Sequence, residues 1–135
     1  MGLFDALSIS STGMSAERLR MDVIAENLAN ADTTRTATGG PYQRQEVVLE
    51  QATPSFGEVL GGVQVAGIVN DPSPPRMVYD PGHPDADKNG YVKMPNVNPV
   101  NEMVDLITAQ RSYEANVTAM SAAKQMITKS LDVLH

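Results

Sequence analysis

Cysteine and tryptophan are absent from this sequence, and aromatic residues make up only 4% of its 135 residues. Without cysteine the chain has no disulfide bond, thiolate metal site or cysteine nucleophile. A core poor in aromatic rings and rich in alanine, valine, leucine and methionine favours helices packed on helices over a large β-sandwich. A chain of this length suits a single domain with a modest core.

Long apolar runs and clusters of positive charge are also missing. A membrane-spanning helix needs about 20 apolar residues, and no run of that length occurs, so we expect no direct membrane insertion. Sixteen acidic and ten basic residues give a net charge of −6, which argues against a nucleic-acid partner. The N-terminal segment lacks a basic stretch followed by an apolar one, so we expect no Sec signal peptide.

Motifs for catalysis and for nucleotide binding are absent as well. The sequence has no G-x-S-x-G, no G-x-x-x-x-G-K-[ST] and no G-x-G-x-x-G. The only histidine away from the terminus, His83, is too little for zinc, which takes about three or four protein ligands. We therefore predict that the chain is not an enzyme and binds no metal or cofactor.

The residues that are present divide the chain into three segments. The first, residues 1–31, is expected to be helical from Leu3 to Ala31, with one apolar stripe. Ser11 or Thr12 is a candidate N-cap within it. The stripe consists of Leu7, Met14, Met21, Ile24 and Leu28.

The second segment, residues 32–98, is rich in turn residues. All nine prolines and most of the glycines fall between Asp32 and Pro99. Turn residues separate short β-like runs, which indicates a β-rich insert with loops. These runs are Gln45–Leu49, Val63–Val69, Met77–Tyr79 and Tyr91–Lys93.

The third segment, residues 99–135, has no glycine and no proline after Pro99, which fits the first turn of a helix. If helical from Val100 to Leu134, it is about 52 Å long. Steps of three and four residues form a heptad seam. The seam is Met103, Leu106, Gln110, Tyr113, Val117, Met120, Lys124, Ile127, Leu131 and Leu134. We predict a mainly α fold with a β-rich insert, in which the N- and C-terminal helices pair in a coiled-coil-like hairpin.

The stretch DADKNG, residues 85–90, is similar to the first half of a calcium-binding loop. Asp85, Asp87 and Asn89 offer oxygens at alternate positions, and a glycine follows. The twelfth position is Asn96, which cannot supply the bidentate carboxylate that such a loop needs. We favour a hairpin turn, because Asn-Gly suits positive φ and aspartates bond to nearby backbone.

Several stretches together resemble the bacterial flagellar axial proteins, and the basal-body rod proteins in particular. In that family a helix ends in a motif of the form ANxxT, which Ala29, Asn30 and Thr33 match. One departure is that Ala31-Asp32 stands where the motif usually has Val-Asn or Ala-Asn. Further similar stretches follow in the same order, so that the resemblance covers essentially the whole chain. They are Gly39–Gln45, Asp80–Ala86, Gly90–Val92, Met94–Val100 and Arg111–Val117.

The resemblance implies a structural, non-enzymatic subunit of the helical rod that crosses the periplasm in the flagellar basal body and transmits torque. It implies export by the flagellar type III apparatus without a cleaved Sec signal. It implies as partners other rod proteins, the rod–ring junction protein and further copies of the chain. It also implies terminal segments that become paired helices on assembly.

The residues support a mechanism for such assembly. Narrow apolar stripes bury little area in an isolated chain, whereas ordering costs about 1–2 kcal/mol per residue. Contact between subunits would bury the stripes at about 25 cal/mol per Å² and couple folding to assembly. The expected assembly surface is Leu7, Met14, Met21, Ile24, Leu28, Met103, Leu106, Tyr113, Val117, Met120, Ile127, Leu131 and Leu134.

Three alternatives remain open at this point. Another flagellar axial subunit, of the rod or hook type, would show the same terminal pattern, although the chain is short for the hook type. A soluble helical-hairpin adaptor would be a monomer with ordered ends. A small calcium-binding module would use Asp85, Asp87 and Asn89, and calcium would then stabilise it.

Overall fold

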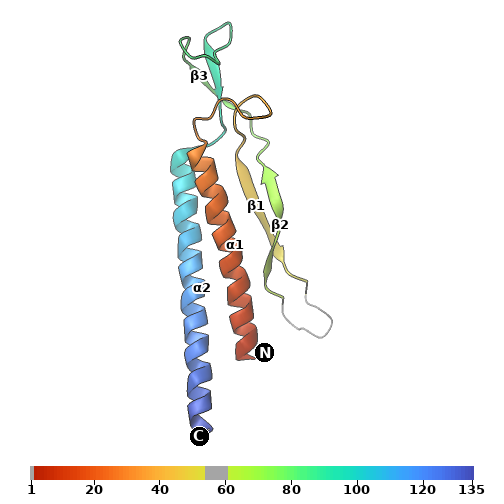
Figure 1. The fold of residues 1–135 in the computed structure, drawn as a ribbon, viewed down its shortest axis with the longest axis vertical. Helices are drawn as coiled ribbons and strands as arrows, with labels where there is room; N and C mark the ends of the chain where they lie inside the picture. Colours follow the sequence, from red (N-terminus) through yellow and green to blue (C-terminus); the bar gives the residue numbers. More distant parts are fainter. Residues whose placement is uncertain (1, 54–60) are drawn as a thin grey trace.

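The computed structural model describes residues 2–53 and 61–135. Its elements are α1 (Leu3–Ala29), β1 (Gln45–Gln51), β2 (Val63–Asn70), β3 (Arg76–Tyr79), β4 (Tyr91–Met94) and α2 (Pro99–Val133). The two helices pack side by side and antiparallel, with both chain ends at the same end of the molecule (Figure 1). The predicted mainly α fold with a β-rich insert is confirmed.

The helices begin and end near the expected residues, for reasons that lie in their caps. α1 ends at Ala29 and not at Ala31, because the N–H of Ala31 bonds to the carbonyl of Leu28, three residues back, at 3.3 Å, and the Nδ2 of Asn30 donates to the carbonyl of Glu26 at 2.9 Å. α2 begins with Pro99, because the side chain of Asn98 accepts the N–H of Val100 at 3.1 Å. Within the described residues, neither helix has the length and apolar character of a membrane span.

Small and polar side chains fill much of the interface between α1 and α2. A Cβ added to Gly13 would lie 2.9 Å from Asn116 Nδ2, which shows how closely the helices approach. On α2, the side facing α1 carries Ala109 and Ala123, which are both buried. Short side chains at these positions allow the two helix backbones to lie close together.

Two contacts define the register of the helical pair. Asn27 contacts Glu102, and Gly13 lies against Asn116, so 14 residues along α1 match 14 along α2. On this register the first residue of α1, Leu3, lies level with Met126. Residues 127–134 therefore extend beyond α1, as Figure 1 shows, and we call them the α2 overhang.

The first strand pair lies against α1 on the side away from α2 (Figure 1). β1 and β2 pair antiparallel, and the register shifts between Val48 and Leu49, where β2 carries the extra residue Ala66. Val47 and Leu49 are half-buried on the side facing α1. α1 is therefore the middle layer between α2 and the β1–β2 hairpin. All four strands lie close to the predicted runs, and each is one or more residues longer than its run.

Thr12 ties α1 to the start of β2. Its hydroxyl accepts the N–H of Val63 at 3.1 Å and donates to the carbonyl of Ile9 at 2.7 Å. α1 runs unbroken through Ser11 and Thr12, so the prediction of an N-cap there is wrong. The hydroxyl of Thr12 instead joins α1 to β2, two elements that are distant in the sequence.

The second strand pair lies beyond the other end of the helices, away from the chain termini (Figure 1). β3 and β4 pair antiparallel from Arg76–Met94 to Tyr79–Tyr91. Val92 of β4, which pairs with Val78, is buried. The rings of Tyr79 and Tyr91 meet edge to face, with centroids 5.3 Å apart, and stabilise the end of the strand pair.

Gly62→Ala is expected to destabilise the fold, because the added Cβ would lie 2.2 Å from Thr12 Oγ1. Thr12 is held by two hydrogen bonds, so strand or helix must shift. We expect the free energy of unfolding in urea to fall by about 1–3 kcal/mol. Gly67→Ala is the matched control, since no atom lies within 4 Å of its added Cβ. Equal losses in the two variants would contradict the role of this contact.

Candidate functional site

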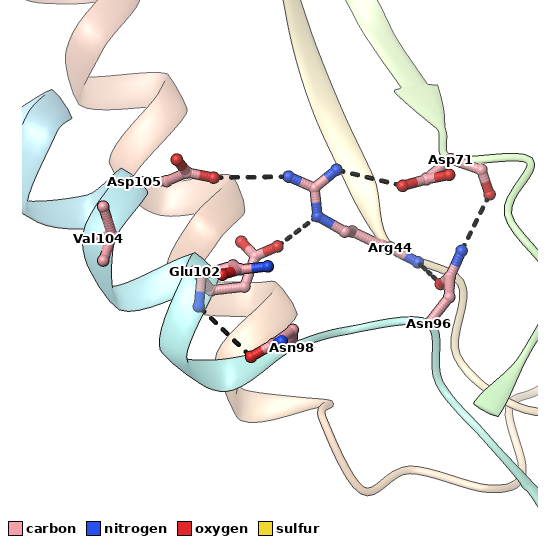
Figure 2. A pocket seen from close by; sticks show the side chains of 8 residues that line it. Arg44, Asp71, Asn96, Asn98, Glu102, Val104 and Asp105 are labelled. Carbon is pink, nitrogen blue, oxygen red and sulfur yellow. Dashed lines mark hydrogen bonds and ion pairs between the residues drawn. The ribbon is translucent and has the colours of Figure 1, made fainter. Parts of the chain in front are cut away.

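Arg44, the residue before β1, is surrounded by carboxylates (Figure 2). Its guanidinium forms ion pairs with Glu102 and Glu46, and lies 3.3 Å from a carboxylate oxygen of Asp71 and 3.7 Å from one of Asp105. The Glu102 side chain is only 1% exposed, so Arg44 compensates a buried negative charge. We call these five residues the polar junction.

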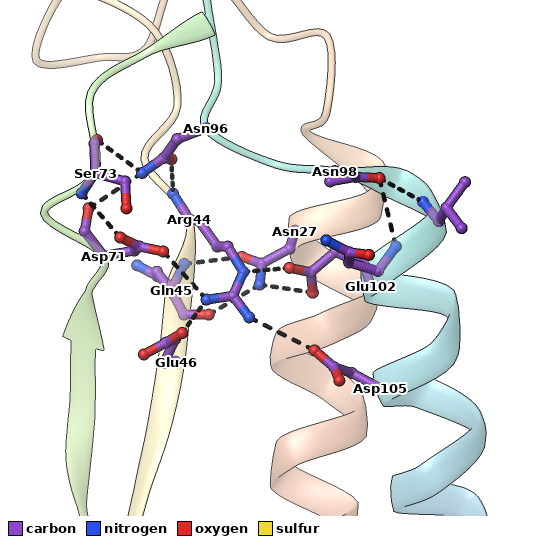
Figure 3. A network of polar contacts seen from close by, with 12 residues as sticks. Asn27, Arg44, Gln45, Glu46, Asp71, Ser73, Asn96, Asn98, Glu102 and Asp105 are labelled. Carbon is purple, nitrogen blue, oxygen red and sulfur yellow. Dashed lines mark hydrogen bonds and ion pairs between the residues drawn. The ribbon is translucent and has the colours of Figure 1, made fainter.

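Asn27 of α1 completes the surroundings of Glu102 (Figure 3). Asn27 is fully buried, and its Nδ2 donates to Glu102 Oε2 at 3.3 Å and to the carbonyl of Gln45 at 2.8 Å. Its Oδ1 accepts the hydroxyl of Tyr42 at 2.9 Å and the N–H of Gln45 at 3.0 Å. One amide thus joins α1 to the start of β1 and to α2.

Asn96 joins the strands of the insert to one another in a similar way (Figures 2 and 3). Its Oδ1 accepts the N–H of Arg44 at 2.8 Å. Its Nδ2 donates to the carbonyls of Asp71, at 3.2 Å, and Ser73, at 3.0 Å. The loops before β1, after β2 and after β4 are therefore fixed at one place, beside the first turn of α2.

Three groups at or near the junction have a shifted pKa. Burial alone would lower the pKa of Arg44, but the carboxylates, with Glu102 foremost, outweigh it and raise that pKa. Hydrogen bonds from Ser73, followed by the charge of Arg44, lower the pKa of Asp71. Burial, followed by the nearby carboxylates, raises the pKa of Tyr42 above 10.0. Arg44 and Asp71 thus stay charged through the neutral range.

An open pocket of about 450 Å³ lies beside the junction (Figure 2). It is lined by Arg44, Asp71, Asn96, Asn98, Asn101, Glu102, Val104 and Asp105. This lining offers carboxylates, amides and one guanidinium, and it includes no nucleophile beside a base. The chemistry of the pocket is that of a hydrogen-bonding surface.

Asp85, the first candidate calcium ligand, bonds to the loop that follows α1. It accepts the hydroxyl of Thr34 at 2.7 Å and forms an ion pair with Arg35. These contacts, with Thr34 first, lower the pKa of Asp85. The carboxylate therefore holds two loops of the insert together.

Asp87, the second candidate, bonds to the backbone of its own turn. Its Oδ1 accepts the N–H groups of Asn89 at 2.8 Å and Tyr91 at 2.9 Å, and Gly90 has a φ of +85°. DADKNG is thus the predicted turn between β3 and β4. In the part of the chain that the structure describes, no three acidic or histidine side chains form a group that could hold a metal ion.

The family-motif residues Ala29, Asn30 and Thr33 lie where α1 ends. Asn30 closes the last turn, and its Oδ1 accepts the hydroxyl of Thr33 at 3.1 Å. The carbonyl of Thr33 in turn accepts the N–H of Tyr42 at 3.0 Å. The motif therefore ends the helix and directs the chain back towards the junction.

The residues expected at the assembly surface fall into two groups. Buried or half-buried residues of the two-helix layer are Leu7, Met14, Met21, Ile24, Leu28, Leu106, Tyr113, Met120 and Ile127. Exposed residues of α2 are Met103, Val117, Leu131 and Leu134, with exposed fractions from 42% to 81%. Their role in assembly stays a prediction.

The expected seam on α2 has two rows of residues seven apart. For one of these rows, the residues that face α1 in the structure lie one position earlier in the sequence. Positions such as Met103 and Val117 are exposed, and their neighbours Glu102 and Asn116 contact α1 instead. The displaced row that faces α1 is Glu102, Ala109, Asn116 and Ala123. Close approach of the helices requires small or hydrogen-bonded side chains there, and this leaves larger apolar ones outside.

Sequence patterns did not reveal the polar junction. Arg44 stands beside a short β-like run, and nothing in its neighbours marks it as half-buried. A signal was present at Glu102, which stands four residues before Leu106 and therefore on the same side of the helix. An acid on an apolar stripe indicates a buried partner, but the sequence does not tell which cation supplies it.

Arg44→Met is expected to lower the free energy of unfolding in urea by about 3–5 kcal/mol, because it leaves a buried carboxylate without its cation. Adding Glu102→Gln removes the unpaired charge and should recover at least about 1 kcal/mol. Arg35→Met is the control, because its side chain is 72% exposed and such pairs contribute less than about 1 kcal/mol. Similar losses at positions 44 and 35 would rule out the special role of the junction.

Asp71→Asn is expected to change how stability depends on pH. A carboxyl whose pKa is lowered in the fold stabilises it above the unfolded value, here 3.8, and this contribution disappears as the pH falls through the folded value. The variant should be less stable than the wild type at pH 7 and should lose less stability below pH 3.8. Thermal unfolding across this range measures both effects. Parallel pH profiles would contradict the assignment.

Comparisons with known proteins agree with the resemblance found in the sequence. Residues 7–35 match the family described as "Flagella basal body rod protein", and residues 88–133 match "Flagellar basal body rod FlgEFG protein C-terminal". The two matches take in most of α1 with its motif, and β4 with α2.

Full-length relatives give the same result. The chain is 45% identical, over its whole length, to the flagellar basal-body rod protein FlgC of Borreliella burgdorferi, 99% of which is covered. It is 45% identical to FlgC of Bacillus subtilis, over 98% of the chain and 99% of that protein. With FlgC of Salmonella typhimurium the identity is 43%, over 97% of each chain. The chain therefore belongs to the FlgC family of flagellar basal-body rod proteins, which are structural proteins and not enzymes.

Proposed function

We propose that this chain is a structural subunit of the flagellar basal-body rod and that its two terminal helices join it to neighbouring subunits. The observation that carries the proposal is the 45% identity to the rod protein FlgC along the whole chain. The large apolar side chains exposed on α2 support the part played by the helices.

The three segments of the chain have different roles in this proposal. Residues 1–31 and 99–135 form the assembly helices, which pair in a coiled-coil-like manner. Residues 32–98 form the insert, which gives the subunit contacts of its own and so its own position in the rod. The exposed apolar residues of α2 support the role of the helices, and the hydrogen bonds of Asn96 to Arg44 and Asp71 support an insert of fixed shape.

Assembly supplies the order that an isolated chain lacks at its ends. Val117, Leu131 and Leu134 are exposed by 42%, 56% and 81%, so they add little to the stability of one subunit. Contact with neighbouring subunits buries them and offsets the conformational entropy of ordering the helix ends. We expect both ends to be labile in the free chain and helical in the rod.

The polar junction keeps the insert in a fixed orientation relative to the helices. Together with Asn27 and Asn96, it joins α1, three loops of the insert and α2 through ionic and amide contacts. A rod that transmits torque needs subunits whose parts do not turn against one another. The many hydrogen bonds at one place meet this requirement better than a small apolar contact could.

The location and partners follow from membership of the rod. We propose that the chain lies in the part of the rod that crosses the periplasm. It reaches that place through the flagellar type III export apparatus and without a cleaved Sec signal. There it contacts copies of itself, other rod proteins and the rod–ring junction protein.

Val117→Asp is expected to block incorporation into the rod while leaving export intact. The change puts a charge into a contact between helices of neighbouring subunits. We expect about a tenfold loss of the chain from isolated basal bodies, which corresponds to about 1.4 kcal/mol at one contact. Immunoblots of basal bodies and of the exported fraction measure the two steps. Thr118→Asp, one residue further on, is the control. Normal incorporation of Val117→Asp would contradict a role for the exposed apolar residues of α2 in assembly.

A further inference from the structure

A second glutamate of the helical pair, Glu17, lies in the middle of α1 and is largely buried. It stands four residues after Gly13, the residue that meets Asn116, and therefore on the side of α1 that faces α2. Its side chain is only 14% exposed. Along the helix it lies about 15 Å from Asn27, and so outside the polar junction.

One oxygen of this carboxylate, Oε2, is buried without a hydrogen bond. Nη1 of Arg20 lies 3.6 Å away, which is close enough for attraction between the charges but longer than a hydrogen bond of about 2.7–3.2 Å. Among the buried side-chain nitrogen and oxygen atoms of the described residues, no other lacks a partner. Such an oxygen lowers the stability of the fold, because water bonds to it in the unfolded chain.

Glu102, the other glutamate between the helices, is surrounded very differently. Arg44 donates to one of its oxygens and Asn27 donates to the other. The helical pair is therefore secured at one buried carboxylate and weakened at a second one. Gly13, one turn from Glu17, adds to the weakness, because glycine lowers the stability of a helix.

We propose that Glu17 is a weak point of the α1–α2 pair, at which the two helices separate in the free chain and so become available to neighbouring subunits. The inference rests on the proposed function, because it assigns one step of assembly to a single residue. The separation is local, since the polar junction holds the other ends of both helices together.

Hydrogen exchange of purified, full-length Glu17→Met tests the weak point. Methionine has nearly the length of glutamate and needs no hydrogen bond, so α1 should separate from α2 less often. We expect the amides of residues 14–21 to exchange about ten times more slowly than in the wild type, which corresponds to about 1.4 kcal/mol. Glu17→Gln, which keeps the shape and removes the charge, should act in the same direction by a smaller factor.

Glu114→Met is the matched control. It makes the same chemical change at an exposed position in the middle of α2. Exchange in this variant should stay within about twofold of the wild type. Exchange around position 17 that is no slower in Glu17→Met than in Glu114→Met would overturn the inference.

Isolated basal bodies test whether the weak point matters for assembly. Chain carrying Glu17→Met replaces the natural copy in cells, and immunoblots measure its amount in the basal bodies. We expect a loss of up to about tenfold, because the separated form becomes about ten times rarer. Adding Ala109→Gly weakens the same interface, in which Ala109 is fully buried, and should restore both exchange and incorporation.

The outcomes separate this inference from the proposed function. Slower exchange with unchanged incorporation would overturn the role of Glu17 in assembly and leave the rod function standing. A loss of incorporation that Ala109→Gly does not restore would also overturn it, because methionine would then disturb a contact directly. Absence of the wild-type chain from purified basal bodies would refute the rod function itself.

Discussion

The buried carboxylate of Glu102 is the constraint on which the rest of the fold depends. A buried charge is tolerated only with a cation and hydrogen-bond donors around it, and here Arg44 and Asn27 supply them from 58 and 75 residues away. α1, the start of β1 and α2 must therefore meet at one point. The carboxylate thereby positions the insert, because Arg44 and Asn96 connect it to the loops after β2 and β4.

Among the residues that the structure describes, the other end of the helical pair has no comparable anchor. Beyond Asn27 and Glu102, the helices contact each other through side chains such as Ala109, Asn116 and Ala123, and α2 continues past the start of α1. Small side chains bury little apolar area per turn. Stability should thus fall from the junction towards the chain ends. Loose ends of this kind agree with our proposal that contact with neighbouring subunits orders the ends of both helices.

The sequence predicted the elements well and their contacts poorly. Proline and glycine marked the limits of the insert, Asn98-Pro99 marked the start of α2, and DADKNG was a turn as expected, because each of these depends on local backbone chemistry. The stripe on α2 was placed one residue off, because periodicity does not tell a face that meets Gly13 from the face beside it. The junction depends on pairs far apart in the sequence, such as Arg44 with Glu102, and no local pattern specifies which residues pair.

Hydrogen exchange of the purified, full-length chain tests the central claim most directly. Amide protection should be highest near Asn27 and Glu102, where the polar junction holds α1 and α2 together, and should decrease along both helices towards the chain ends. The last turns of α2, beyond Met126, should exchange fastest among the helical residues, because α1 does not cover them. Uniform protection along both helices, or protection highest at the chain ends, would contradict a fold anchored at the junction and completed by assembly.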